Sequence, residues 1–595
     1  MRPQILFAGV MVFGVFLSGC AAPRHHAAPP VQPTVAAGAD AAFQRHVDSV
    51  LEEMWAEFPE YATRVGNYRH ADRVSVPDAA RRQRAVDFYT RQLDALAKFD
   101  PAMLNASNRV DLVLMKNRFE SSRWQLTTFK SWQWQPSSYN VGGDFGVLIN
   151  TEFAPLETRL RQVIARLHKV PAYYAAAKAA IDNPTLEHTQ LALIQNRGAL
   201  RIFGEDLEKK VAGSSLTVDE KAVFTARNTA AKAAVNGYIE FLTALEAKLK
   251  QGGARSFRIG KDLYAQKFAY DIQSSMTVEQ LHQRALQEKA ALHDAMEKLA
   301  RQLWPKWMAG KPMPADRLDM IRAVLDELSK RHTRREAFVE TIRAQIPALE
   351  KFVREKDLVD QDPTRPLVVR ETPPYMRGGG AGASISAPGP FDPTANTYYN
   401  VTPLDHFTDA QAASFLREYN DWTLQILNIH EAIPGHYTQL MHANKSKSLV
   451  KSLFGNGAMI EGWAVFSEKV MLDAGYDNGS PEIWISWMKW NLRSVMNTIL
   501  DIEIQTMNLQ REDALRYMIR EAFQQETEAT EKWRRATFSQ VQLTSYFAGY
   551  AEITALRDEL KAKQGDKFTV KGFNNRFLSY GNAPVKFIAE LMRAP

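Results

Sequence analysis

Apolar residues recur at intervals of three and four positions along most of the chain between residues 41 and 355. The run Leu160, Val163, Ile164 and Leu167 is one example, and residues 281–299 are another. This spacing places apolar side chains on one face of a helix. The same period returns from Asp409 to about Lys563, where Trp and Met are frequent. The pattern therefore predicts a mainly α protein.

Residues 363–405 interrupt the helical pattern. They contain Thr372-Pro-Pro-Tyr, a glycine-rich run over 378–382, and the segment Asn-Thr-Tyr-Tyr-Asn-Val over 396–401. Glycine and proline separate short runs of β-forming residues here, as they do around strands. We expect two short strands joined by a glycine-rich loop, which gives a small β element before the metal-binding helix proposed below.

Composition excludes several classes of protein. The chain has 595 residues, of which 45% are apolar and 24% charged, and a single cysteine. These values exclude disorder, a disulfide scaffold and a cysteine-rich zinc module. The length allows more than one lobe. The formal net charge of +7 is diffuse and forms no long basic block, so we expect no nucleic-acid partner.

The amino terminus resembles a bacterial lipoprotein signal. Arg2 precedes an apolar run over residues 5–17, and Leu-Ser-Gly-Cys ends at Cys20. The resemblance implies that residues 1–19 are a signal peptide and that Cys20 carries a lipid that attaches the protein to the membrane. Ala21 after the cysteine implies the outer membrane, facing the periplasm. Residues 20–40 then form the lipid-anchored cysteine and a flexible Pro/Ala-rich linker. The alternative is a chance cysteine after an ordinary cleavage site.

The segment with the strongest catalytic or metal-binding pattern is His-Glu-Ala-Ile-Pro-Gly-His over residues 430–436. Two imidazoles and a carboxylate suit Zn²⁺, and Glu431 lies where a general base for a water molecule is expected. On a regular helix, however, His436 would lie roughly 120° away from His430. Pro434 and Gly435 permit a break that returns His436 toward His430. A broken helix is therefore a requirement of the metal hypothesis.

A further ligand should come from the apolar helical segment that follows. Glu461 and Glu468 are seven residues apart, so they share one helix face, and carboxylates in such an apolar helix need a partner. Ordinary hydrogen bonding of buried His and Glu is the competing explanation. If His442 or Glu468 closed the coordination sphere as a fourth ligand, a non-catalytic envelope binding lipoprotein would be favoured.

The pattern His-Glu-x-x-Pro-Gly-His, followed by Glu-Gly-Trp-Ala, resembles the bacterial family of domain of unknown function 885, regarded as zinc peptidases. The other segments that match are Phe257-Arg-Ile-Gly, Leu263-Tyr264, Thr372-Pro-Pro-Tyr, Gln439, Gln542, Tyr546, Gly549, Leu556-Arg557 and Gly581-Asn-Ala-Pro. The resemblance covers residues 41–595. It implies one large helical catalytic unit of the neurolysin and angiotensin-converting-enzyme kind. We place its two lobes at about 41–355 and 356–595.

The resemblance implies that one zinc ion is held by His430, His436 and Glu461, with Glu431 as the general base. Tyr546 would stabilise the oxyanion, or alternatively it is a core tyrosine of its helix. Two positions depart from the family pattern. Many members have a histidine four residues after an aspartate, where this chain has Asp501 and Gln505, and Gln-Val at 540–541 replaces Pro-Gly. Both departures leave the substrate class open.

The function expected from these features is metal-assisted hydrolysis of a peptide-like amide in the cell envelope. The strand near Tyr399 and Asn400 could pair with an extended substrate, or it could be a purely structural hairpin. Gln439, which follows the histidine motif, is the third candidate for substrate binding. An amidohydrolase acting on a non-peptide or cell-wall-derived amide is the alternative enzyme.

One other catalytic motif is present in form only. Ser448-Leu-Val-Lys451 matches the S-x-x-K of penicillin-binding enzymes, but no K-T-G follows it. Because Lys445 and Lys447 lie beside it, we expect a solvated basic turn.

Overall fold

The computed structural model describes residues 35–594 except 363, 365, 374–381, 392–395 and 406. The expected signal peptide, Cys20 and most of the linker lie outside this part of the chain. The described residues are mainly helical, with one small sheet, so the predicted fold class is confirmed at that level. None of the described helices has both the length and the apolar character that crossing a bilayer requires.

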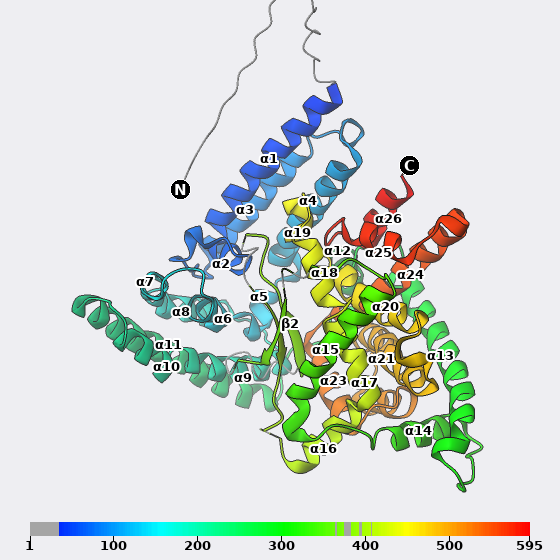
Figure 1. The fold of residues 1–595 in the computed structure, drawn as a ribbon. Coiled ribbons are helices and arrows are strands. Elements are labelled where there is room, and N and C mark those ends of the chain that lie inside the picture. The colour runs from blue at the N-terminus through cyan, green and yellow to red at the C-terminus, as the bar shows by residue number, and fades with distance from the viewer. Residues whose placement is uncertain are drawn as a thin grey trace, which may run out of the picture.

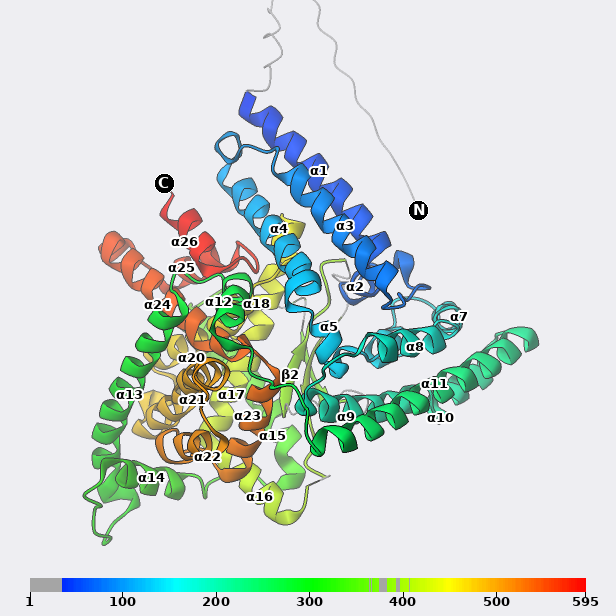
Figure 2. The same ribbon diagram turned by 180° about the vertical axis from the view of Figure 1, so that it is seen from behind.

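The first helices form a bundle at the amino-terminal end of the described chain, where α1, α3 and α4 lie side by side (Figures 1 and 2). Their apolar faces belong to the same hydrophobic core as the second half of the chain. The bounds are α1 (Val35–Glu57), α2 (Pro59–Arg64), α3 (Ala79–Leu96), α4 (Ala106–Trp124) and α5 (Ser131–Trp134).

The next helices form an arm, residues 142–250, which projects to one side of the molecule (Figures 1 and 2). The arm has a smaller core of its own. The run from Leu160 to Leu167 lies within α7 with its apolar residues buried, as its spacing predicts. The helices are α6 (Gly142–Asn150), α7 (Leu156–Leu167), α8 (Val170–Ala180), α9 (Leu186–Ile202), α10 (Glu205–Ala212) and α11 (Val218–Lys250).

Helices from α12 onward pack around the larger core, which spans both sides of the boundary that we expected near residue 355. The division into two cores therefore follows the arm and not that boundary. The first group is α12 (Gly260–Asp271), α13 (Val278–Trp307), α14 (Arg317–Leu328), α15 (Phe338–Glu355), α16 (Asp409–Glu418), α17 (Asp421–Glu431), α18 (His436–Ala443) and α19 (Leu449–Leu453). The second group is α20 (Gly457–Asp473), α21 (Pro481–Thr506), α22 (Arg511–Arg516), α23 (Glu526–Phe538), α24 (Ser545–Gln564), α25 (Val570–Leu578) and α26 (Val585–Arg593).

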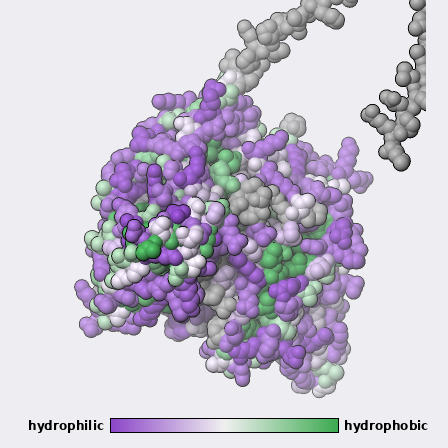
Figure 3. Space-filling view, turned by 60° about the vertical axis from the view of Figure 1, so that its left-hand side comes forward, coloured by the Kyte–Doolittle hydropathy of each residue, from purple (hydrophilic) through white to green (hydrophobic). Residues whose placement is uncertain are grey.

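The face in Figure 3 is mostly hydrophilic, and its apolar residues gather in a few separate areas. This is the usual distribution for helices that turn one apolar face inward. On this face, polar side chains therefore cover most of the core.

The small sheet has three strands, one more than predicted: β1 (Leu367–Glu371), β2 (Ala383–Ser386) and β3 (Thr397–Val401). Their order is β1-β3-β2, with β1 parallel and β2 antiparallel to β3. The strand with Tyr399 and Asn400 is therefore central, and both of its backbone edges are already paired. The expectation that this strand pairs with a substrate backbone is wrong for that reason.

Helices α20 and α24 cross with their backbones in contact. A Cβ atom added to Gly462 would lie 2.4 Å from Gly549 Cα, and one added to Gly549 would lie 1.7 Å from the carbonyl oxygen of Ala458. Only glycine allows an approach this close. The crossing fixes the helix that carries Glu461.

A buried ion pair joins the amino-terminal bundle to the second half of the chain. Lys451 of α19 donates to Asp111 of α4, and the side chains are 3% and 2% exposed. Lys451 also donates to Ser107 Oγ at 3.0 Å, while Ser448 Oγ donates to Asp111 at 2.8 Å. The expected solvated basic turn is therefore wrong: these residues form a buried polar contact between distant segments.

Several of the family-matching positions meet in one buried network around Asp501 of α21. The Tyr264 hydroxyl and the Val541 backbone N–H both donate to Asp501 Oδ2, at 2.6 and 2.8 Å. Gln505 accepts from the Ile259 N–H at 3.2 Å. The two departures from the family pattern thus lie together in a structural junction.

This network makes a prediction about pH. Burial raises the pKa of Asp501 to about 7, from an ordinary value of 3.8, although its hydrogen bonds oppose the shift. The folded state therefore binds a proton more tightly than the unfolded state does, and Asp501 stabilises the fold less as pH rises from about 4 to 7. Because Asn keeps an oxygen acceptor for both donors, the free energy of unfolding of Asp501→Asn should rise relative to wild type over that interval. Urea denaturation at several pH values measures this difference, and a constant difference would contradict it.

Candidate metal centre

The turn between α17 and α18 brings the two histidines together. Helix α17 ends at Glu431 and α18 begins at His436, so the helix breaks where the metal hypothesis requires. The Ile433–Pro434 peptide bond is cis. The Gly435 N–H donates to the Ile429 carbonyl at 3.0 Å, and a Cβ atom on Gly435 would lie 1.9 Å from the His430 carbonyl oxygen. Glycine is therefore needed for the chain to turn this tightly.

Three side chains converge beyond this turn. The Nε2 atoms of His430 and His436 lie 3.8 and 3.5 Å from Glu461 Oε2. One ligand atom from each residue lies within 4.8 Å of the others. Tetrahedral zinc with bonds of about 2.0–2.1 Å needs ligand atoms roughly 3.3–3.5 Å apart. Small side-chain movements would bring the predicted set to that spacing, so its two imidazoles and one carboxylate fit a zinc ion.

Glu468 contacts the ring nitrogen of His430 that faces away from the candidate metal position. His430 Nδ1 lies 2.7 Å from Glu468 Oε1, on the ring edge opposite the ligand atom. The indole N–H groups of Trp487 and Trp490 each donate to Glu468 at 3.0 Å. A carboxylate on the second nitrogen of a metal-binding histidine fixes its orientation and increases its basicity. Glu468 is therefore a positioning residue for His430.

Neither candidate fourth ligand closes the site. Glu468 contacts the far side of His430, and His442 Nε2 lies 2.9 Å from the carbonyl oxygen of Asp360. The described residues thus provide three candidate ligands, which is the number typical of catalytic zinc.

The charges at the site favour a cation. Although burial opposes it, contact with His430 and His436 holds the pKa of Glu461 below its usual value. Burial likewise opposes protonation of His430, yet Glu461 and Glu468 raise its pKa well above the usual value. Burial raises the pKa of Glu431, and the two histidines oppose this. The protein environment therefore stabilises positive charge between these groups.

Two contacts hold the metal-binding elements against each other. The Trp463 indole N–H donates to the Pro434 carbonyl at 2.9 Å, which ties α20 to the turn. Asn456 caps α20 by accepting from the Met459 N–H at 2.8 Å. Glu461 is thus positioned by a capped helix whose backbone is also locked against α24.

Tyr546 lies on α24, three residues before the Gly549 crossing point. Its hydroxyl accepts from Arg535 at 3.1 Å, and the same guanidinium donates to Gln542 at 2.8 Å. Among the described residues no hydrogen bond joins Tyr546 to the histidines or to Glu461. Its helix is held against the metal-binding helix, while an oxyanion role remains a prediction.

The three candidate substrate-binding residues are fully buried. The Tyr399 hydroxyl donates to Asn428 Oδ1 at 2.8 Å, and Asn400 accepts from Arg370 at 2.7 Å. Gln439 donates to Asn582. These bonds give all three side chains structural partners. Tyr399 nevertheless lies close enough to Glu431 for the carboxylate to contribute, after burial, to raising its pKa.

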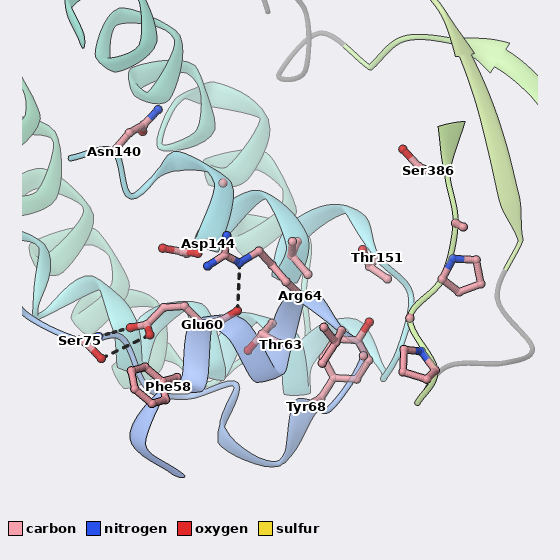
Figure 4. Close-up of a pocket in the computed structure, with 18 of the residues that line it drawn as sticks. Phe58, Glu60, Thr63, Arg64, Tyr68, Ser75, Asn140, Asp144, Thr151 and Ser386 are labelled. Atoms are coloured by element: carbon pink, nitrogen blue, oxygen red, sulfur yellow. Dashed lines mark hydrogen bonds between the residues drawn. The ribbon is translucent and has the colours of Figure 1, made fainter. Parts of the chain in front are cut away.

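A large cavity of about 1850 Å³ lies between the amino-terminal bundle, the arm and the sheet. Figure 4 shows Arg64 and Asp144 on one side of it and Ser386 on the other. The metal ligands do not line it, but Leu440 and Asn444 do. Leu440 follows His436 by one turn of α18 and shares its helix face, and Asn444 lies directly after the end of the helix. Helix α18 therefore runs from the metal centre to the cavity wall.

Sequence reasoning missed the role of Glu468 and its two tryptophans. The spacing of Glu461 and Glu468 indicated a shared face, but the local sequence did not reveal that Glu468 contacts the far nitrogen of His430. Trp487 and Trp490 lie three residues apart on α21, which is a weak signal by itself. Their common acceptor became visible only when α20 and α21 were placed together.

This arrangement predicts a measurable effect of Glu468. Glu468→Gln should weaken zinc affinity by about 10–100-fold, because the His430 ring loses its charged acceptor. Competition with a chromogenic chelator measures the affinity. Glu503→Gln, on another partly buried His–Glu contact at 2.9 Å, is the matched control and should keep normal affinity. Unchanged affinity in Glu468→Gln would contradict the positioning role.

Comparison with solved structures gives two similar proteins. A candidate lipoprotein of unknown function from Shewanella oneidensis is 50% identical, with a TM-score of 0.83, over 92% of this chain and 99% of that one. A candidate lipoprotein from Colwellia psychrerythraea is 17% identical, with a TM-score of 0.75, over 94% of this chain and 98% of that one, and shares the fold. No curated protein matches. A family model matches residues 59–592, and the chain belongs to that family, described as "Bacterial protein of unknown function (DUF885)".

Proposed function

We propose that the protein is a zinc-dependent hydrolase that cleaves peptide-like amide bonds in the cell envelope. The observation that carries this proposal is the convergence of His430, His436 and Glu461, with Glu431 directly after the first histidine. Three ligands leave a coordination position for water or substrate, as in catalytic zinc sites.

A bound zinc ion would supply Lewis acidity at this site and lower the pKa of a coordinated water. Glu431 takes a proton from the attacking water and delivers it to the departing amine. Its raised pKa makes it a better proton acceptor than an exposed glutamate. Glu468 keeps the His430 ring in place through this transfer. We assign Tyr546 as a donor to the developing oxyanion.

The cavity supports a substrate larger than a single amino acid. Its volume of about 1850 Å³ exceeds the roughly 300–1,000 Å³ typical of small-molecule sites. The guanidinium carbon of Arg82 lies 3.9 Å from the ring centre of Trp132, and that of Arg370 lies 3.6 Å from the ring centre of Tyr398. The cavity wall therefore offers both planar apolar and charged surfaces. A peptide presents partners for both.

We also propose that Cys20 carries a lipid that anchors the protein in the outer membrane, with the catalytic unit in the periplasm. The Leu-Ser-Gly-Cys pattern and the similar candidate lipoprotein from Shewanella oneidensis support the lipid anchor, and Ala21 after the cysteine supports the outer membrane.

Metal analysis tests the site. Purified mature protein should hold close to one zinc ion per chain, and the double variant His430→Ala/His436→Ala should hold only background metal, because two of three ligands are lost. His442→Ala, outside the ligand set, is the control. Full zinc retention in the double variant would contradict the assignment, and a zinc-loaded wild type that cleaves no member of a peptide library would contradict the activity.

A further inference from the structure

Lys532 is a buried lysine that pairs with no acidic side chain among the described residues. In the part of the chain that the structure describes, three lysines are buried: Lys451, Lys489 and Lys532, at 2%, 8% and 5% exposure. Lys451 pairs with Asp111, and Lys489 donates to Glu418 at 2.9 Å. Lys532 has no hydrogen bond or ion pair to any described residue. Burial of an unpaired ammonium is unfavourable, and a bound anion would offset that cost.

The surroundings of Lys532 contain more positive than negative groups. Arg493 of α21 pairs with Glu528 of α23, and Lys489 uses Glu418. Arg493 Nη1 makes no hydrogen bond to a described residue, although it lies 3.8 Å from Glu418 Oε1. Arg535, one turn after Lys532, contacts only the neutral Gln542 and Tyr546 through its Nη2 atom. Glu418 and Glu528 thus already have basic partners, and no described carboxylate pairs with Lys532 or Arg535.

The pKa of Lys532 agrees with this excess of positive groups. Burial lowers its pKa well below the usual value, and Arg493 and Arg535 lower it further, while Glu528 and Glu418 oppose them. An anion bound between these groups would relieve the repulsion.

Two contacts place this basic cluster (Arg493, Lys532 and Arg535) beside the metal centre. The Trp490 ring lies 6.3 Å from the His430 ring, and the Arg493 guanidinium lies 5.0 Å from the Trp490 ring. Each of these two distances is shorter than the length of two extended residues, which is at most about 7 Å. On the other side, Arg535 donates to Tyr546, whose helix crosses the one that carries Glu461.

We propose that the basic cluster binds the free C-terminal carboxylate of a peptide substrate. The inference rests on the proposed hydrolase function and makes the protein an exopeptidase. An ammonium and two guanidinium groups match a carboxylate, which accepts charge-assisted hydrogen bonds at both oxygens.

Paired peptides test the proposal: the same sequence with a free C-terminal acid or with a C-terminal amide. Wild type should cleave the acid with a kcat/KM roughly 10–100-fold higher, mainly through KM, because the amide leaves the cationic donors unpaired. Lys532→Met should lose this preference, and Lys532→Arg should retain most of it. Arg534→Met, at an exposed position on the same helix, is the matched control and should behave as wild type.

Binding separates this proposal from the hydrolase function. The variant Glu431→Gln, which we expect to keep its metal, should bind the acid peptide more tightly than the amide in titration calorimetry. Adding Lys532→Met should remove that difference. Acid-selective binding without hydrolysis by wild type would support the carboxylate site and contradict the hydrolase. Hydrolysis without any acid preference would do the reverse.

Stability distinguishes a ligand-binding lysine from a structural one. Because Lys532 has no partner, Lys532→Met should leave the thermal midpoint unchanged or raise it. A clear drop in the midpoint, together with an intact acid preference, would overturn the proposal.

Discussion

The variant Glu431→Gln should lose about 10²–10⁴-fold in kcat for peptide hydrolysis while it keeps its zinc. Glu431 is the last residue of α17 and follows the ligand His430, so the amide fills the same space. An amide cannot accept the proton of the attacking water. The three proposed ligands are untouched, and metal content should therefore equal that of wild type. Steady-state kinetics and metal analysis on the same preparation measure both quantities.

Two further variants make this result specific. Glu431→Asp keeps a carboxylate but shortens it, so it should retain part of the activity. Glu590→Gln, at an exposed position, applies the same chemical change away from the site and should leave kcat unchanged. An unaltered rate in Glu431→Gln would remove Glu431 from the mechanism, and a loss of zinc would assign it a role in holding the metal.

Lys451→Ala should lower the free energy of unfolding by about 3–5 kcal/mol. The substitution leaves Asp111 charged, 2% exposed, and deprived of its cationic partner. Because the pair joins α4 to α19, it acts across the contact between the amino-terminal bundle and the rest of the core. Urea denaturation of the variant and of wild type gives the difference.

A double variant separates the ion pair from the packing. Lys451→Met/Asp111→Leu removes both charges with little change of volume, so it should recover most of the lost stability. Lys445→Ala, whose ion pair with Asp362 is partly exposed, is the control and should cost less than about 1 kcal/mol. A loss below 1 kcal/mol in Lys451→Ala would show that the buried pair contributes little.

The helices and the turn between His430 and His436 could be predicted because their signals are local. Apolar spacing over Leu160–Leu167 reports directly on which side of a helix is buried. The Pro434-Gly435 pair interrupts any regular helix, and His430 and His436, six positions apart, can meet only if the helix breaks between them. Each of these inferences uses neighbours in the chain and basic helix geometry.

The partners of buried charges could not be predicted, because they lie far away in the sequence. Lys451 is 340 residues from Asp111, and its basic neighbours indicated a solvated turn. Likewise Glu468 is 38 residues from His430, and its choice of nitrogen depends on how α17 and α20 pack. The order of the three strands could not be predicted for the same reason. The pattern of residues along β3 does not indicate which strands lie beside it.

The backbone contact between Gly462 and Gly549 also limits how the molecule can open. At this crossing the backbones of α20 and α24 are in direct contact, with no side chains between them, so the two helices cannot slide past each other. Glu461 therefore moves only when both helices move. The arm, in contrast, has its own core and lines one side of the cavity. If the proposed substrate enters this cavity, we expect the arm to move as a body while the candidate metal centre stays rigid.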